Sequence, residues 1–163
     1  MVFSDIVGFT TISQTFTPLK VAQMLDRLYL AFDELARKHK VFKVETIGDA
    51  YMGVTNLEGN EFDTHAKQIA LFALEAIGAA NTILIDEDKP ELGHIRIRVG
   101  FHSGPVVSNV IGSLNPRFGL FGVSKGQVED CRASLSPKLT NLLLLLFKKG
   151  HGQHRKPNGE QLY

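Results

Sequence analysis

The sequence has little cysteine and no long apolar run, and each of these absences excludes a class of protein. The single Cys131 excludes an intrachain disulfide and a multi-cysteine zinc site, and it suits a reducing compartment. The longest apolar run near the end, Leu142 to Phe147, is too short to span a bilayer. The chain shows no signal peptide and no Asn-x-Ser/Thr sequon, so we expect a protein on the cytoplasmic side rather than a secreted one.

Charge divides the 163 residues into two parts. Residues 1–122 carry 11 basic and 14 acidic side chains, whereas residues 123–163 carry 7 and 3. Because the basic part lacks interleaved aromatic residues, we expect no nucleic-acid partner. The sequence therefore predicts one folded core over residues 1–122, followed by a divergent basic segment over residues 123–163 that is partly disordered.

The pattern of apolar residues predicts alternating strands and helices. One long helix begins at Thr17-Pro18, where a capping side chain precedes a proline at the first helical position. The other expected elements are strands over 2–7, 41–47, 50–55, 95–101 and 106–111 and a helix over about 63–85. This order predicts an α+β fold, a ferredoxin-like βαββαβ sheet with helices on one face, plus an extra strand and an incomplete or atypical C-terminal subdomain.

Two acids stand at strand ends that this topology brings together. In a ferredoxin-like sheet the first and third strands are central, antiparallel neighbours, so Asp5 should meet Asp49. Two adjacent carboxylates repel each other unless a cation lies between them, and carboxylate and backbone oxygens suit Mg²⁺ or Mn²⁺. The backbone around Gly8 leads towards a helix and is suited to holding phosphates.

Four motifs resemble the catalytic domain of class III nucleotide cyclases, the adenylate/guanylate cyclase family, and guanylate cyclases in particular. The motifs are FSDIVGFT (3–10), KVETIGDAYM (43–52), GFHSGP (100–105) and NPRFGLFG (115–122). They occur in the family's order and spacing over residues 2–122.

The resemblance implies a two-metal reaction at a dimer interface. Asp5 and Asp49 match the family's metal-binding aspartates, and the carbonyl of Ile6 matches its backbone ligand. Two Mg²⁺ (or Mn²⁺) ions per site would bind the triphosphate, and one would activate the ribose 3′-hydroxyl for attack on the α-phosphorus. GTP, or less favourably ATP, would yield a 3′,5′-cyclic nucleotide and pyrophosphate in intracellular signal transduction.

The resemblance also assigns phosphate-binding and base-reading positions. Glu45 stands where guanylate cyclases carry a glutamate and adenylate cyclases a lysine. A carboxylate accepts hydrogen bonds from guanine N1–H and N2–H₂, whereas adenine N1 is itself an acceptor. The second base-reading position is Gly119, which has no side chain, so one determinant of two favours GTP. The amides expected to hold the β- and γ-phosphates are those of Val7, Gly8, Phe9 and Thr10.

The resemblance stops where the family carries an asparagine and an arginine that stabilise the transition state. Those positions hold Gly126 and Asp130, and Arg132 lies two places late. A homodimer would lack the pair in both sites, whereas a heterodimer with an intact cyclase domain would keep one complete site. The alternative function is therefore a catalytically impaired homologue that binds nucleotide and metal as a dimerisation partner. We hypothesise that residues 123–163 arise from altered splicing, a frameshift or a faulty gene model.

Two further expectations concern the wider context. A diguanylate cyclase is a third interpretation, because that class shares the sheet and the paired acids. It is disfavoured because this chain has Ile47-Gly48-Asp49 in place of the Gly-Gly-Asp/Glu-Glu-Phe turn of that class. Membrane attachment would come only through segments outside this sequence, which in the family often precede the catalytic domain, so the full-length parent could be membrane-anchored.

Overall fold

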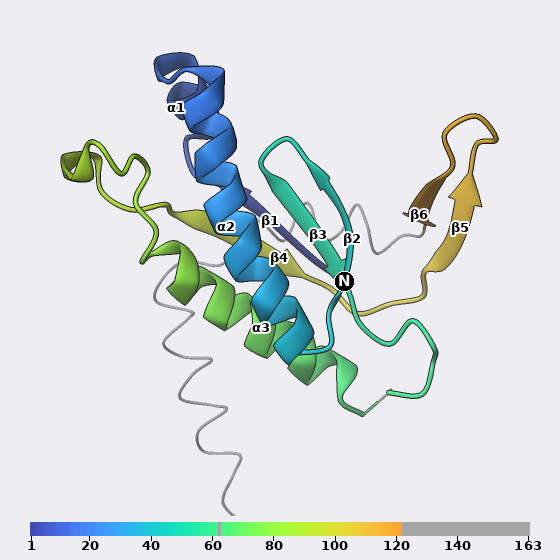
Figure 1. Cartoon of the computed structure of the whole chain (residues 1–163). Coiled ribbons are helices and arrows are strands. Elements are labelled where there is room, and N and C mark those ends of the chain that lie inside the picture. The colour runs from blue at the N-terminus through green and yellow to red at the C-terminus, as the bar shows by residue number, and fades with distance from the viewer. Residues whose placement is uncertain (62, 122–163) are drawn as a thin grey trace, which may run out of the picture.

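A computed structural model describes residues 1–61 and 63–121, which form six strands, three α-helices and a short 3₁₀ turn (Figure 1). In chain order the elements are β1 (Val2–Ile6), α1 (Phe9–Thr15), α2 (Pro18–Lys38), β2 (Phe42–Ile47), β3 (Ala50–Val54), α3 (His65–Ala80), a 3₁₀ turn (Pro90–Leu92), β4 (Ile97–Phe101), β5 (Val107–Ile111) and β6 (Arg117–Phe121). The segment 123–163 lies outside the described residues, so its expected character stays a prediction.

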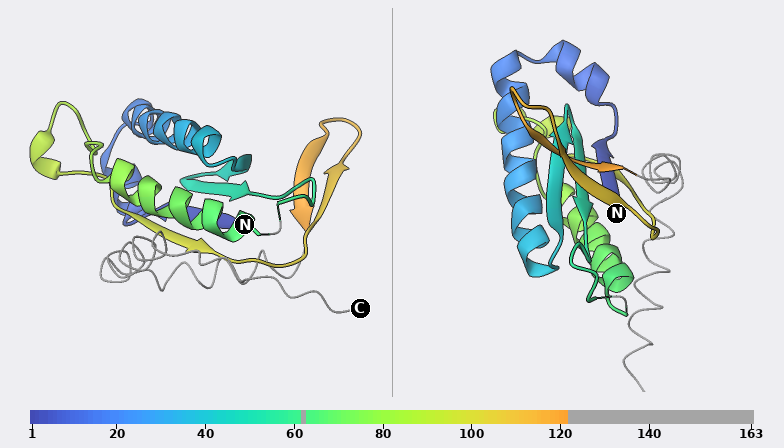
Figure 2. Two further views of the ribbon diagram at one scale, coloured as in Figure 1. Left: turned by 90° about the horizontal axis from the view of Figure 1, so that it is seen from below. Right: turned by 90° about the vertical axis from the view of Figure 1, so that its right-hand side faces the viewer.

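Four strands form one antiparallel sheet in the order β2-β3-β1-β4. The first and third strands are neighbours at its centre, as the predicted topology requires. Helices α2 and α3 lie together over one face, while β5 and β6 form a separate ribbon beside the sheet (Figures 1 and 2). The prediction of an α+β, ferredoxin-like sheet with helices on one face is confirmed.

Helix α2 forms where its capping signals and apolar spacing predict it. The Thr17 hydroxyl accepts a hydrogen bond from the Lys20 amide at 3.4 Å, and Pro18 is the first helical residue. Its buried residues recur at helical spacing: Met24, Leu28, Phe32 and Ala36. Burying each of the larger of these side chains stabilises the fold by roughly 1.5–3 kcal/mol, so this stripe fixes α2 on the sheet.

The two faces of the sheet carry different apolar clusters. Side chains alternate along each strand, so Val2, Ile6 and Tyr51 face the helices, whereas Phe3 and Met52 face away. We call the face that carries Phe3 and Met52 the second face. The strand β6 packs against it through buried Leu120 and partly buried Phe118. The side chain of Asp5 lies on the second face by the same alternation.

Three details differ from the elements expected from the sequence. Helix α1 follows Gly8, which adopts a left-handed φ of 74°, and its seven residues are too few to show helical periodicity. Strand β6 lies inside the last family motif and was not expected as a strand. Helix α3 ends at Ala80 rather than near 85, because the chain then turns to place the Ile83 carbonyl against the Ile95 amide at 2.8 Å.

Within residues 1–61 and 63–121, no helix combines the length and the apolar character that a membrane span requires.

Candidate active site

The structure brings Asp5 and Asp49 to the same end of the sheet. Asp5 lies near the end of β1, and Asp49 lies in the turn between β2 and β3, the strand that pairs antiparallel with β1. The Ile6 amide donates a hydrogen bond to Oδ2 of Asp49 at 2.9 Å. This contact joins residues that are 43 positions apart, and it places the Asp49 carboxylate beside the peptide that follows Asp5.

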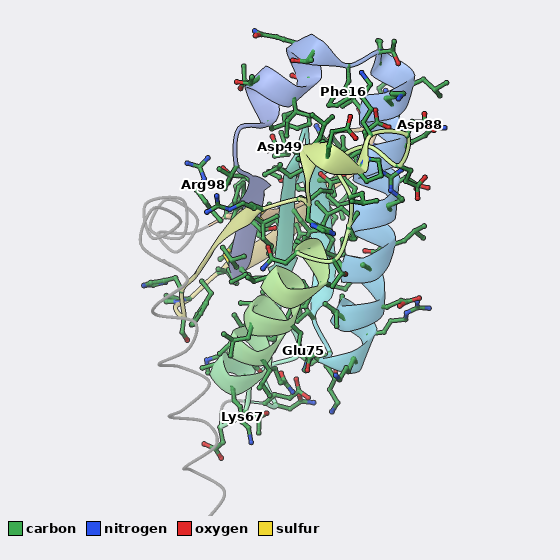
Figure 3. The ribbon with its side chains drawn as sticks, turned by 90° about the vertical axis from the view of Figure 1, so that its left-hand side faces the viewer. Phe16, Asp49, Lys67, Glu75, Asp88 and Arg98 are labelled. Atoms are coloured by element: carbon green, nitrogen blue, oxygen red, sulfur yellow. The ribbon has the colours of Figure 1, made fainter. Side chains whose placement is uncertain are left out.

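Arg98 holds the Asp5 carboxylate from the neighbouring strand. Asp5 and Arg98 are direct cross-strand partners in β1 and β4, and both guanidinium-to-carboxylate distances are 2.8 Å. Asp5 is 7% exposed, so a charged hydrogen-bonding partner is needed to offset its desolvation. The Asp5 hydrogen bonds and charge, with a smaller contribution from Asp49, raise the pKa of Arg98. Figure 3 shows Asp49 and Arg98 near the same end of the sheet.

Arg98 is a site residue that the sequence patterns do not predict. The alternation of Ile95, Ile97 and Val99 correctly predicts that the arginines point away from the helix-side core. It does not say what lies opposite them, because that depends on the register between β1 and β4. A signal was available in the predicted topology, since the strand after the second helix must also border the first strand.

The turn that carries Asp49 is fixed from the helix side as well. Gly48 adopts a left-handed φ of 60°, and Ile47 pairs with Ala50, which makes Gly48-Asp49 a two-residue hairpin turn. The Tyr29 hydroxyl of α2 donates a hydrogen bond to the Gly48 carbonyl at 2.9 Å. Burial and, to a smaller extent, the Asp49 charge raise the pKa of Tyr29 to about 12, so the hydroxyl stays a donor at neutral pH.

The expected phosphate-binding loop lies between β1 and α1. The Val7 amide donates to the Arg96 carbonyl at 2.8 Å, so it has a partner within the protein in this conformation. The amides of Phe9 and Thr10 belong to the first turn of α1, where N–H groups have no partner within the helix. Phosphate binding by Val7, Gly8, Phe9 and Thr10 stays a prediction.

Of the two predicted base-reading residues, Glu45 lies on the second face, and Gly119 lies in β6, the strand that packs against that face. Glu45 is opposite Met52 in the β2–β3 ladder, next to a register shift, and its Oε2 is 3.4 Å from Nη2 of Arg117 in β6. Gly119 follows two residues after Arg117 and therefore shares its side of β6. A Cβ at Gly119 would lie 3.0 Å from the Phe121 ring. Any larger residue at this position would therefore force the ring to move.

The donor set fits a hard divalent cation that also binds phosphate. In residues 1–61 and 63–121, no group of three or more His, Cys, Asp or Glu side chains could hold a metal ion by itself. Mg²⁺ is commonly held by only one or two carboxylates, with substrate phosphates and water as the other ligands. Asp5, Asp49 and the Ile6 carbonyl match that pattern.

The fold is that of a class III nucleotide cyclase domain. Residues 1–127 match the family model for the adenylate and guanylate cyclase catalytic domain, and the chain belongs to this family. Over 120 residues it is 47% identical to retinal guanylyl cyclase 2 of Homo sapiens and 48% identical to receptor-type guanylate cyclase Gyc76C of Drosophila melanogaster. These alignments cover 74% of this chain but only 11% and 8% of the relatives, so the chain spans about a tenth of their length.

Solved structures show the same relationship. The guanylate cyclase domain of RhGC from Catenaria anguillulae, in complex with GTP, is 36% identical with a TM-score of 0.73, over 82% of this chain and 70% of that one. An atypical dimeric guanylyl cyclase domain of the RhoGC fusion protein from Blastocladiella emersonii is 34% identical with a TM-score of 0.71, over 82% and 71%. The expected kinship with guanylate cyclases is confirmed.

Proposed function

We propose that this chain is a guanylate cyclase domain that converts GTP to 3′,5′-cyclic GMP and pyrophosphate in signal transduction. The observation that carries the proposal is the meeting of Asp5 and Asp49 at one end of the sheet, joined through the Ile6 amide. Relatives named as guanylyl cyclases support it, and so does the similarity to a domain in complex with GTP.

Asp5, Asp49 and the Ile6 carbonyl would hold two Mg²⁺ or Mn²⁺ ions. Such ions, when bound, supply Lewis-acid stabilisation of phosphoryl oxygens and lower the pKa of a coordinated hydroxyl. The protein's own contribution is to hold the two carboxylates in place before the ions arrive. Arg98 does so for Asp5 through two hydrogen bonds, and the Ile6 amide does so for Asp49.

Glu45 would select guanine by accepting hydrogen bonds from its N1–H and N2–H₂ groups. The same carboxylate would repel the acceptor N1 of adenine, which disfavours ATP. Arg117 lies 3.4 Å from Glu45 and would help to orient its carboxylate. Gly119 on the same side of β6 contributes no side chain, so the preference for GTP rests on Glu45.

The chain would act as one half of a dimeric site. The positions that carry the family's transition-state asparagine and arginine hold Gly126 and Asp130, which lie outside the described residues. A cyclase domain that supplies this pair would complete the site built on Asp5 and Asp49. Exposed apolar side chains on the β5–β6 ribbon would suit such a contact: Val107, Val110, Ile111 and Phe121.

A second candidate function follows from the same two substitutions. Without positioned cations at a phosphoryl transition state, turnover falls by orders of magnitude, so the lone chain would bind GTP and metal without forming product. The chain would then serve as the metal-bearing partner of another cyclase. Its relatives include receptor-type guanylate cyclases, and we propose a membrane-anchored parent with this domain on the cytoplasmic side.

Incubating the purified chain with Mn²⁺ and either GTP or ATP separates the two candidates. Cyclic GMP formed by the chain alone, and lost in an Asp49→Asn variant, would establish a self-sufficient enzyme. Binding of GTP without product would favour the partner role. An absence of both nucleotide and metal binding would contradict the proposed function in either form.

A further inference from the structure

Tyr29 contacts the Gly48-Asp49 turn between β2 and β3, which positions Asp49. Its hydroxyl, on α2, donates to the Gly48 carbonyl at 2.9 Å across 19 residues of sequence. That carbonyl belongs to the peptide group that joins Gly48 to Asp49. Because a peptide group is planar, fixing the carbonyl oxygen also fixes the direction in which the Asp49 backbone leaves the turn.

The turn has little other packing around it. Gly48 has a left-handed φ of 60°, and among the described residues no atom beyond its chain neighbours lies within 4 Å of the place that a Cβ would take. Ile47, just before the turn, is 53% exposed. A two-residue turn that projects into open space can fluctuate unless a tether holds it.

Tyr29 itself, on α2, has partners on the β2–β3 hairpin. Its ring lies 6.0 Å from the ring of Tyr51, and Nζ of Lys43 lies 5.6 Å from its centre. Lys43 is in turn 2.9 Å from a carboxylate oxygen of Asp33, so α2 and β2 are joined beside the ring. The hydroxyl is therefore presented to the turn by a partly buried side chain that packs against the helix-side core.

We infer that Tyr29 is a positioning residue for the metal site, an inference that rests on the proposed function. The Tyr29 hydroxyl orients the Gly48–Asp49 peptide from the helix side, while the Ile6 amide orients the Asp49 carboxylate from the strand side. Together the two contacts hold Asp49 in place before a cation binds. Pre-organisation of this kind raises affinity because no ordering cost remains at the moment of binding.

Tyr29→Phe and Tyr51→Phe make a matched pair for the test. Each removes one hydroxyl from the same aromatic cluster, but the Tyr51 hydroxyl donates to Asp33 at 3.2 Å and does not touch the turn. We would titrate the full 163-residue chain with Mn²⁺ and follow the paramagnetic broadening of the Ile6 and Asp49 amide signals by NMR. Thermal unfolding of both variants would measure their loss of stability separately.

We expect Tyr29→Phe to raise the Mn²⁺ concentration for half-broadening roughly fivefold, the factor that a net hydrogen-bond free energy of about 1 kcal/mol represents. Tyr51→Phe should stay within about twofold of wild type, since its lost hydrogen bond only lowers general stability. Equal half-broadening concentrations for wild type and Tyr29→Phe would overturn the inference, and so would equal weakening in both variants. If wild type shows no broadening at Ile6 and Asp49, the metal site of the proposed function fails, and the inference fails with it.

Discussion

Asp5 and Arg98 face each other across β1 and β4, joined by two hydrogen bonds of 2.8 Å each. The acid is almost fully buried, while about half of the Arg98 side chain is exposed. The Asp5 carboxylate is thus paired with a cationic side chain of the protein before any metal ion binds. The pair belongs to the fold and to the candidate site at once, so its removal should affect both.

Arg98→Ala should lower the free energy of unfolding by about 1–2 kcal/mol, because the buried Asp5 carboxylate loses its guanidinium partner while the exposure of Arg98 limits the loss. Urea denaturation monitored by circular dichroism measures this change. Arg96→Ala is the matched control, because Arg96 is an exposed arginine two residues before Arg98. This substitution should lower the free energy of unfolding by less than about 0.5 kcal/mol. Equal losses in the two variants would show that the Asp5–Arg98 pair contributes nothing.

Glu45→Lys should reduce GTP turnover in an assembled dimer by roughly 100-fold, since the new ammonium cannot accept from guanine N1–H and N2–H₂. It should reduce ATP turnover less or raise it, because an ammonium can donate to adenine N1. Steady-state assays with both nucleotides give the ratio. Glu34→Lys, an exposed position on α2, controls for the change of charge. An unchanged GTP-to-ATP ratio in Glu45→Lys would remove Glu45 from base recognition.

Acid should weaken the contact between α2 and the loop after α3 through Asp86. The Lys20 ammonium is 2.6 Å from the Asp86 carboxylate, and this hydrogen bond is the main cause that lowers the pKa of Asp86 below its ordinary 3.8. A depressed folded-state pKa contributes stability above pH 3.8, and that contribution is lost as the pH falls through the folded value.

Asp86→Asn should therefore be less stable than wild type at pH 7, and the difference should shrink as the pH falls below 3.8. Thermal unfolding between pH 7 and pH 2 measures the trend. Asp88→Asn, which removes a more exposed carboxylate 3.1 Å from the same lysine, should show a smaller difference. A stability difference for Asp86→Asn that is constant with pH would contradict the assignment.

Sequence patterns predict the elements whose signals are local. Thr17-Pro18 and the apolar stripe of α2 give its start and its buried face, and the element order gives the pairing of β1 with β3. The meeting of Asp5 with Asp49 follows from that pairing, so half of the candidate site was predictable without coordinates.

The other contacts depend on register and packing, which no local pattern encodes. Arg98 reaches Asp5 because β1 and β4 pair in one particular register, and the Val7 amide is engaged because Arg96 lies opposite it. In the sequence Tyr29 is indistinguishable from an ordinary helix residue, and its contact with the Gly48 carbonyl is visible only in the folded structure. These side chains support the site from other elements, and only the tertiary structure reveals them.

The central claim is that this chain supplies the metal-binding and base-reading half of a cyclase site that a partner completes. A direct test mixes this chain with a second guanylate cyclase domain that keeps the transition-state asparagine and arginine but has both metal aspartates replaced by asparagine. The assay measures cyclic GMP formed from GTP in the presence of Mn²⁺. We predict little product from either protein alone, clear product from the mixture, and loss of that product when this chain carries Asp49→Asn. A mixture no more active than its separate components, or one that Asp49→Asn leaves unchanged, would contradict the account.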